Sequence, residues 1–166
     1  MTTEQAPTQQ TPRQLLIEWE RRCRRNIDTH AWAERRFDRL NMVCAVASIG
    51  SLVALGVIAA GFDLTKGNAR YWVVALSVLA ALTSVLLVVR DYASQAAAHR
   101  IAARQYGALR REIEVISLTE QMAPNEVMTR ISALQKRWDW AADVAPNAPK
   151  SIREKADKVS RERHYV

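Results

Sequence analysis

The sequence predicts an all-α membrane protein, in which a two-helix transmembrane hairpin extends into a cytoplasmic antiparallel stalk and is followed by one or two further cytoplasmic helices. Three features of the 166-residue chain predict this fold. Two stretches, 40–62 and 71–89, contain no Asp, Glu, Lys, Arg or His, and each is long enough to cross a bilayer, which takes about 20 apolar residues. A heptad spacing of apolar residues flanks both stretches, and Lys and Arg gather before the first and after the second. An ordinary soluble globule is excluded, because an exposed hairpin of this hydrophobicity would aggregate in water.

The part of the chain before the first apolar stretch divides into a polar lead and a helix. Residues 1–12 lack the basic start and the apolar run of a signal peptide, so they are predicted to be a disordered N-terminus. Residues 13–41 are predicted to form a stalk helix, with Pro12 as its start signal. The seam of this helix recurs at alternating steps of three and four, and its positions include Leu16, Trp19, Cys23, Asn26 and His30.

The hairpin is predicted to consist of a transmembrane helix at 42–62, an outer linker at 63–70 and a second transmembrane helix at 71–89. Amphipathic aromatic rings prefer the headgroup layer of a membrane. The residues that bracket the linker and are expected to act as interface anchors are Phe62, Tyr71 and Trp72.

The basic residues near the spans predict the orientation of the hairpin. Lys and Arg in short flanking segments concentrate on the cytoplasmic side of a membrane. Those nearest the spans are Arg35, Arg36 and Arg39 before the first and Arg90, Arg100 and Arg104 after the second. Both termini are therefore expected in the cytoplasm.

The second transmembrane helix is predicted to continue without a break into a second stalk helix at 90–122, because no Pro interrupts residues 71–123. This helix repeats the heptad alternation of the first stalk helix. Its main seam positions are His99, Tyr106, Leu109, Ile113 and Ile116.

Equal distance from the membrane sets an antiparallel register for the two stalk helices. In this register Asn26 lies beside Tyr106, and His30 and His99 lie at similar heights. A histidine pair can bind a metal or titrate near neutral pH. No Cys, Asp or Glu on the seam completes a metal site, so polar core histidines are the favoured interpretation and no metal is predicted.

Beyond the stalk, a helix is predicted at 125–142 and is expected to fold back on the stalk. Its apolar positions are spaced four, three and four residues apart and are Val127, Ile131, Leu134 and Trp138. A proline-containing linker is predicted at 143–150, because each Pro withholds an amide donor. Ser151 and Glu154 predict a capping box for a short charged helix and tail at 151–166.

Small residues line one face of each predicted span, at the spacing that lets helix backbones approach closely in lipid. These residues are Ala47, Gly50, Ser51 and Ala54 in the first span, and Ser77, Ala80, Ala81 and Ser84 in the second. Packing of the two helices within one hairpin is the simpler interpretation. The alternative assigns one face to the intrachain contact and leaves Ser48, Thr83 or another hydroxyl face for subunit contacts or a water-lined path.

The sequence contains none of the local patterns that mark catalytic or cofactor sites. It has no Gly-rich phosphate loop, no nucleophile elbow and no HExxH, and neither span holds an Asp, Glu, Lys, Arg or His. No enzyme activity and no cofactor are therefore predicted. The net charge of +7 raises nucleic acid as a partner, but the arginines alternate with acidic residues and lack an aromatic stacking pattern. Nucleic acid is thus disfavoured, and Cys23 and Cys44 are interpreted as small apolar fillers.

Two segments and the hairpin together carry a family resemblance. After the second span the chain reads HRIAARQYGALRREIE from His99 to Glu114, and near its end it reads APNAP from Ala145 to Pro149. With the short outer linker, these features resemble the SLATT family, the two-transmembrane effector domains of bacterial conflict systems. The resemblance runs from about Trp19 to Lys150.

The resemblance implies a membrane effector of antiphage defence in the bacterial inner membrane. Such an effector oligomerises and permeabilises or depolarises the membrane when a sensor or signal-generating protein of the same system detects infection, and growth arrest or death follows. Family members often accompany enzymes that make nucleotide signals. This chain has no recognisable nucleotide-binding domain, so a direct nucleotide ligand is left unassigned.

Two other hypotheses compete with a permeabilising effector. In the first, the hairpin only anchors a non-enzymatic scaffold, whose cytoplasmic helical bundle recruits another protein through Trp138 or the tail. In the second, Arg35, Arg36 and Arg39 form a basic platform for anionic lipid. The more distant Arg21 to Arg25 fit that idea only if the helix lies flat on the membrane, because an upright stalk would hold them well beyond a Debye length.

Overall fold

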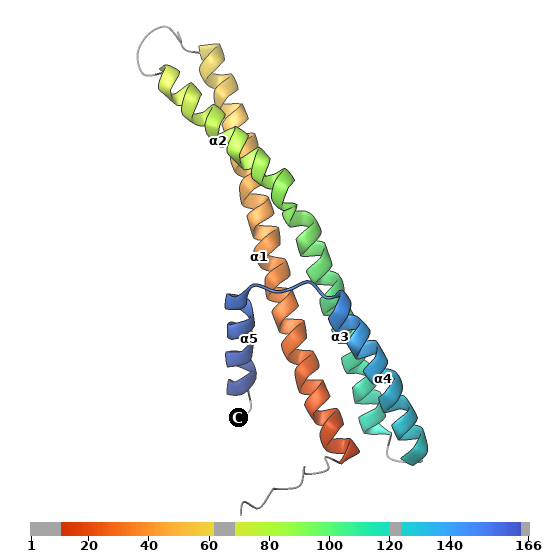
Figure 1. Cartoon of the computed structure of the whole chain (residues 1–166). Helices are drawn as coiled ribbons and strands as arrows, with labels where there is room; N and C mark the ends of the chain where they lie inside the picture. The colour runs from red at the N-terminus through yellow and green to blue at the C-terminus, as the bar shows by residue number, and fades with distance from the viewer. Residues whose placement is uncertain (1–10, 62–68, 120–123, 164–166) are drawn as a thin grey trace, which may run out of the picture. The chain divides into compact units, whose positions relative to one another are not determined.

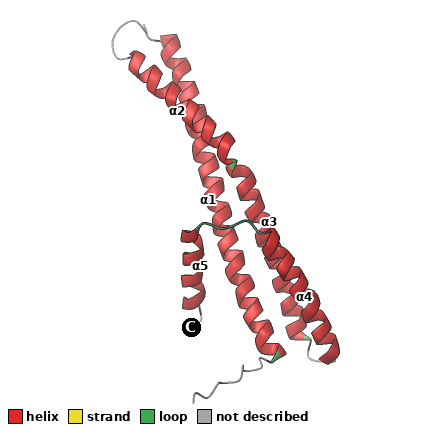
Figure 2. Ribbon diagram, viewed as in Figure 1, coloured by secondary structure: helices red, strands yellow, loops and turns green. Residues whose placement is uncertain are grey.

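The computed structural model describes residues 11–61, 69–119 and 124–163, and within these ranges it contains helices and no strand. The five helices are α1 (Pro12–Gly61), α2 (Ala69–Arg90), α3 (Tyr92–Leu118), α4 (Pro124–Val144) and α5 (Lys150–Glu162) (Figures 1 and 2). The predicted all-α class is therefore confirmed. The expected disorder before residue 11, the anchor Phe62 and most of the expected outer linker lie outside the described residues.

The chain forms two compact units, to which α1 and α3 both contribute. The hairpin unit is Glu34–Ala97, and the bundle unit combines Met1–Ala33 with Ala98–Val166. Each unit has its own contacts and is described separately below.

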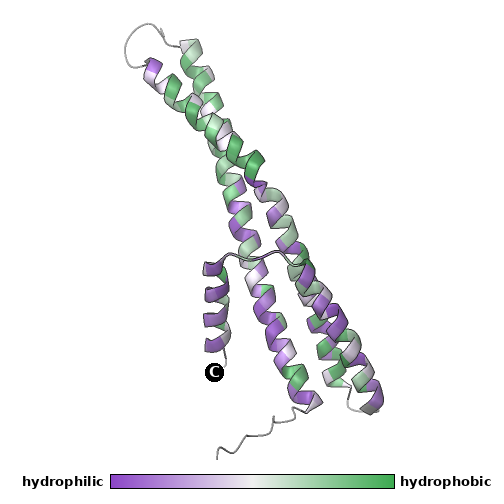
Figure 3. Ribbon diagram, in the orientation of Figure 1, coloured by the Kyte–Doolittle hydropathy of each residue, from purple (hydrophilic) through white to green (hydrophobic). Residues whose placement is uncertain are grey.

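The hairpin unit contains the two apolar helical segments. Both belong to helices that are long and apolar enough to cross a membrane, and only 11% of each apolar window is buried inside the chain. Hydrophobic colour predominates along both segments in the view of Figure 3. A core helix of a soluble protein would instead bury most of such a window.

The break between α2 and α3 at Asp91 corrects the expectation of one unbroken helix. Asp91 has φ 39°, a left-handed conformation that short polar side chains tolerate better than most. Its amide still donates to the Leu87 carbonyl at 3.2 Å, and its carboxylate accepts from the amide of Ser94 at 3.2 Å. Asp91 thus ends one helix and caps the next.

The physical reason for this break lies in the spacing of the contact residues. The half-buried Leu87 of α2 and the half-buried Tyr92 of α3 are five residues apart, whereas a heptad seam advances by three or four. The left-handed conformation of Asp91 accommodates the additional residue in this spacing. Tyr92 then stacks on Phe37, with ring centroids 6.3 Å apart.

Replacing Asp91 by alanine is expected to lower the free energy of unfolding by about 1 kcal/mol, because alanine loses the cap and disfavours positive φ. Asp91→Asn is expected to retain most of the stability, since asparagine accepts the same bond and tolerates the same φ. Thermal unfolding of both variants in detergent micelles, followed by far-UV circular dichroism, tests this. Equal losses in the two variants would contradict the capping role.

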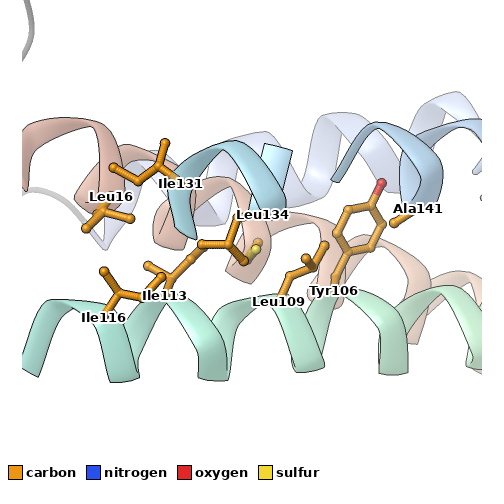
Figure 4. Close-up of a cluster of buried hydrophobic side chains, with 9 residues drawn as sticks. Leu16, Tyr106, Leu109, Ile113, Ile116, Ile131, Leu134 and Ala141 are labelled. Carbon is orange, nitrogen blue, oxygen red and sulfur yellow. The ribbon is translucent and has the colours of Figure 1, made fainter. Parts of the chain in front are cut away.

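The core of the bundle unit lies where α1, α3 and α4 meet. The side chains at its centre are drawn in Figure 4. They come from the seam of α3 at 106–116 and from apolar positions of α1 and α4, and they are Leu16, Cys23, Tyr106, Leu109, Ile113, Ile116, Ile131, Leu134 and Ala141. Helix α4 therefore folds back on α1 and α3, and its return buries the apolar stripe that the sequence places on it.

Helix α5 begins at Lys150, and Pro149 is its N-cap, with no side-chain cap bond. The expected capping box of Ser151 and Glu154 is therefore wrong, because Ser151 already lies inside the helix. Proline at this position supplies a fixed φ that suits a helix start. The helix buries Ile152 and Ala156, and it forms an ion pair with α1 between Arg25 and Asp157 at 3.3 Å.

Candidate functional site

Hydroxyl side chains occupy the contact between the two apolar helices of the hairpin unit. Ser48 and Ser84 share a hydrogen bond at 2.9 Å, across the helices. Ser51 donates to the Ala47 carbonyl at 2.7 Å, and Thr83 donates to the Leu79 carbonyl at 2.8 Å. Each hydroxyl thus has a partner, which removes the free-energy cost of an unsatisfied polar group in an apolar surrounding.

The small residues of the two spans divide between this contact and the exposed surface. Ser48, Ser51, Ala80 and Thr83 are buried in the hairpin unit, at 7%, 4%, 6% and 8% exposure. The alternative that placed Ser48 or Thr83 on a separate face is therefore wrong, because both lie in the intrachain contact. Ala47 and Ala54 are half-buried.

Three predicted packing residues lie outside the contact. Gly50, Ser77 and Ala81 are exposed in the hairpin unit, and a Cβ added at Gly50 would meet nothing within 4 Å. Ser84 is exposed too, although its hydroxyl reaches Ser48. Ser77, Ala81 and Ser84 follow one another at steps of four and three, so they form one stripe, which we call the exposed small face of α2.

The two described anchors lie at the start of α2. Tyr71 and Trp72 are exposed, and the Arg70 guanidinium lies 4.9 Å from the centroid of the Tyr71 ring. Their position next to the end of an apolar helix is the one in which aromatic rings meet the headgroup layer.

A buried histidine pair is the main polar feature of the bundle unit. His30 of α1 and His99 of α3 are 6% and 2% exposed, and their Nδ1 atoms are 2.9 Å apart. One ring donates and the other accepts, which requires a neutral acceptor. Burial, with a smaller contribution from His99, lowers the pKa of His30 to about 4. His30 is therefore uncharged near neutral pH.

Aromatic and polar groups surround the pair. The Tyr106 ring stacks on His30 with centroids 5.7 Å apart, and burial raises the pKa of the Tyr106 hydroxyl, which also bonds to Asn26. A cavity of about 260 Å³ opens beside His30 and Tyr106 and reaches Asn147. The sequence register placed Asn26 and Tyr106 together, and they do contact each other.

The other seam residues serve as core. Cys23 is fully buried, and this burial raises the pKa of its thiol to about 12, which suppresses the reactive thiolate. Trp19 packs at the edge of the core and stacks on Trp138 of α4, with centroids 6.3 Å apart. Among residues 11–61, 69–119 and 124–163, no three His, Cys, Asp or Glu side chains gather to hold a metal ion.

Sequence reasoning missed the contact between α5 and α1. Asp28 of α1 accepts from Arg163 at 3.0 Å, and the Lys155 ammonium lies 4.7 Å from the centroid of the Trp32 ring. The available signal was the apolar spacing of Ile152 and Ala156, which matches a helix that buries one narrow stripe. The stripe is narrow, because this charged 13-residue helix buries only Ile152 and Ala156.

The fold and these contacts define an all-helical protein with two helices suited to crossing a membrane and a separate helical bundle. No protein-family model matches the chain, and comparison with curated proteins and with solved structures gives no match.

Proposed function

We propose that the chain is a membrane effector whose hairpin crosses the bacterial inner membrane with both termini in the cytoplasm. In this proposal copies of the chain oligomerise through the hairpin and permeabilise or depolarise the membrane when triggered, and growth arrest or death follows. The resemblance to the SLATT family favours a role in antiphage defence. A sensor or signal-generating protein of the same system would supply the trigger.

The exposed small face of α2 is the observation that carries this proposal. Small residues at a helix surface allow close backbone approach, which drives association where lipid offers no hydrophobic force. The hairpin's own contact already uses Ala80 and Thr83, so the stripe with Ser77 and Ala81 is left for another copy. An oligomer is required for a pore, because two helices do not enclose an aqueous path.

Replacing Ala81 by leucine is expected to slow depolarisation by about tenfold or more, because a bulky side chain in a close helix contact costs about 1–3 kcal/mol. The measurement is membrane potential and dye entry in bacteria during graded induction, at matched membrane abundance of each variant. The matched control is Ala75→Leu, since Ala75 is exposed on a different face of α2. Equal depolarisation by wild type and Ala81→Leu would contradict assembly through this face.

A membrane-anchored scaffold is the second candidate function. A groove of about 530 Å³ between α3 and α4 favours it, because the groove offers Val115, Ala133 and Leu134 beside Arg111 and Arg137. Trp138, whose disruption is expected to abolish function in a scaffold, is half-buried and stacks on Trp19. Intact membrane potential at every induction level, including during phage infection, would favour the scaffold.

A further inference from the structure

Helix α5 lies beside α1 in the bundle unit (Figure 1). Arginine side chains gather between the two helices. A cavity of about 110 Å³ there is lined by Arg21, Arg24, Arg25, Asp28, Ser160 and Arg163. An adjoining cavity of about 400 Å³ shares Arg25 and Ser160 and adds Asp157 and Arg161. We call these two cavities together the arginine cleft.

The carboxylates around the arginine cleft do not balance its guanidinium groups. Asp28 pairs with Arg163 at 3.0 Å and Asp157 pairs with Arg25 at 3.3 Å. Glu20 lies one turn before Arg24 on α1 and forms an ion pair with it at 2.5 Å. These three carboxylates are each already engaged by an arginine.

Two arginines of the cleft are left without a carboxylate. Within the part of the chain that the structure describes, no ion pair is found for Arg21 or Arg161. Among the described residues, the Arg161 guanidinium donates to a backbone carbonyl, that of Asp157 at 3.3 Å. Docking of α5 on α1 therefore concentrates positive charge that the described carboxylates do not neutralise.

The remaining contacts of α5 with the bundle are few. Ile152 and Ala156 are its buried residues, and Lys155 lies over the Trp32 ring. A small apolar contact set against like-charge repulsion makes docking sensitive to any group that adds negative charge to the cleft.

A phosphoryl group supplies the negative charge that the arginine cleft lacks, and its oxygens match the geometry of guanidinium groups. Guanidinium groups bind phosphoryl oxygens through paired, charge-assisted hydrogen bonds, and a serine hydroxyl such as that of Ser160 donates to the same oxygens. The smaller cavity has room for one such group and the larger one continues from it. We propose that the arginine cleft binds a phosphoryl anion and that the bound anion holds α5 against α1.

The full chain in non-ionic detergent micelles tests this site with inorganic diphosphate as the probe. Calorimetric titration should give saturable binding, and amide hydrogen exchange should slow by about tenfold or more in α5 when the probe is bound. A second arm uses the full chain in lipid discs of phosphatidylcholine with and without phosphatidylglycerol. Protection of α5 by diphosphate assigns a soluble phosphoryl ligand, and protection only by phosphatidylglycerol assigns a lipid headgroup.

The double variant Arg21→Gln/Arg161→Gln should weaken whichever binding is found by about tenfold or more, since charge-assisted bonds are lost. Both residues are exposed, so helicity by circular dichroism should match wild type. The matched control is Arg104→Gln, which removes an exposed arginine of α3 far from the cleft in sequence and not among its lining residues. Absence of α5 protection in both arms, or an equal loss in the Arg104 variant, would overturn the proposal.

Discussion

Replacing Ile113 by alanine is expected to lower the free energy of unfolding of the bundle unit by about 3 kcal/mol, within the 2–5 kcal/mol typical of such truncations. Ile113 is 1% exposed and is one of the largest fully buried side chains of the chain. It lies in the core cluster with Leu16 of α1 and Leu134 of α4 (Figure 4). Three helices contact this position, so little local collapse is available to fill the cavity.

Urea unfolding of the full chain in detergent, followed by tryptophan fluorescence, measures this loss, because Trp19 and Trp138 pack against the same core. The control is Ile101→Ala, the same truncation on the same helix at a side chain that is 54% exposed. Its effect is expected to stay within about 0.5 kcal/mol. Similar losses in the two variants would show that the cluster does not form the core of the unit.

The bundle unit is expected to lose about 2 kcal/mol of stability as the pH falls from about 6.5 to about 4. The folded-state pKa of His30 is lowered to about 4 from its ordinary value of 6.5, so in this window the unfolded chain binds a proton that the folded chain excludes. Stability therefore rises with pH through the window and is fully present above it. The full shift corresponds to about 3 kcal/mol, which is reduced here for partial solvation of the ring.

Urea unfolding at pH 7, 5 and 4 measures this dependence. The double variant His30→Gln/His99→Gln removes the pair and leaves His164, so its profile should be flatter than that of wild type by about 2 kcal/mol. Parallel profiles for wild type and variant would rule out the pair as the source of the pH dependence.

The two apolar helices and the core seam could be predicted from the sequence because strong patterns encode them. The charge-free stretches locate the apolar helices, and heptad spacing from Leu16 to Ile116 selects residues that form the core. The same register brought His30 and His99 to similar heights, and their rings are in contact.

The details that the sequence did not reveal have identifiable physical causes. The spans are apolar on every face, so hydropathy does not reveal which face turns to the partner helix. For that reason the sequence left open whether Ser48 and Thr83 belong to the intrachain contact, in which both are buried. The break at Asp91 depends on a left-handed residue, for which the sequence carries no Pro or Gly signal. A gap of five residues between Leu87 and Tyr92 was the available sign. The arginine cleft forms where α5 docks on α1, and this contact between distant parts of the chain has no local sequence pattern.

The histidine pair also restricts how α1 and α3 can slide along each other. Apart from Asn26, which bonds to Tyr106, the buried seam residues on either side of the pair are aliphatic, small or aromatic. Such side chains tolerate a displacement by one heptad with modest changes in packing. Such a displacement would separate His30 from His99 and leave two ring nitrogens buried without partners, a cost of about 1–3 kcal/mol for each group. One buried polar pair therefore selects a single alignment of two helices whose apolar contacts alone would permit several.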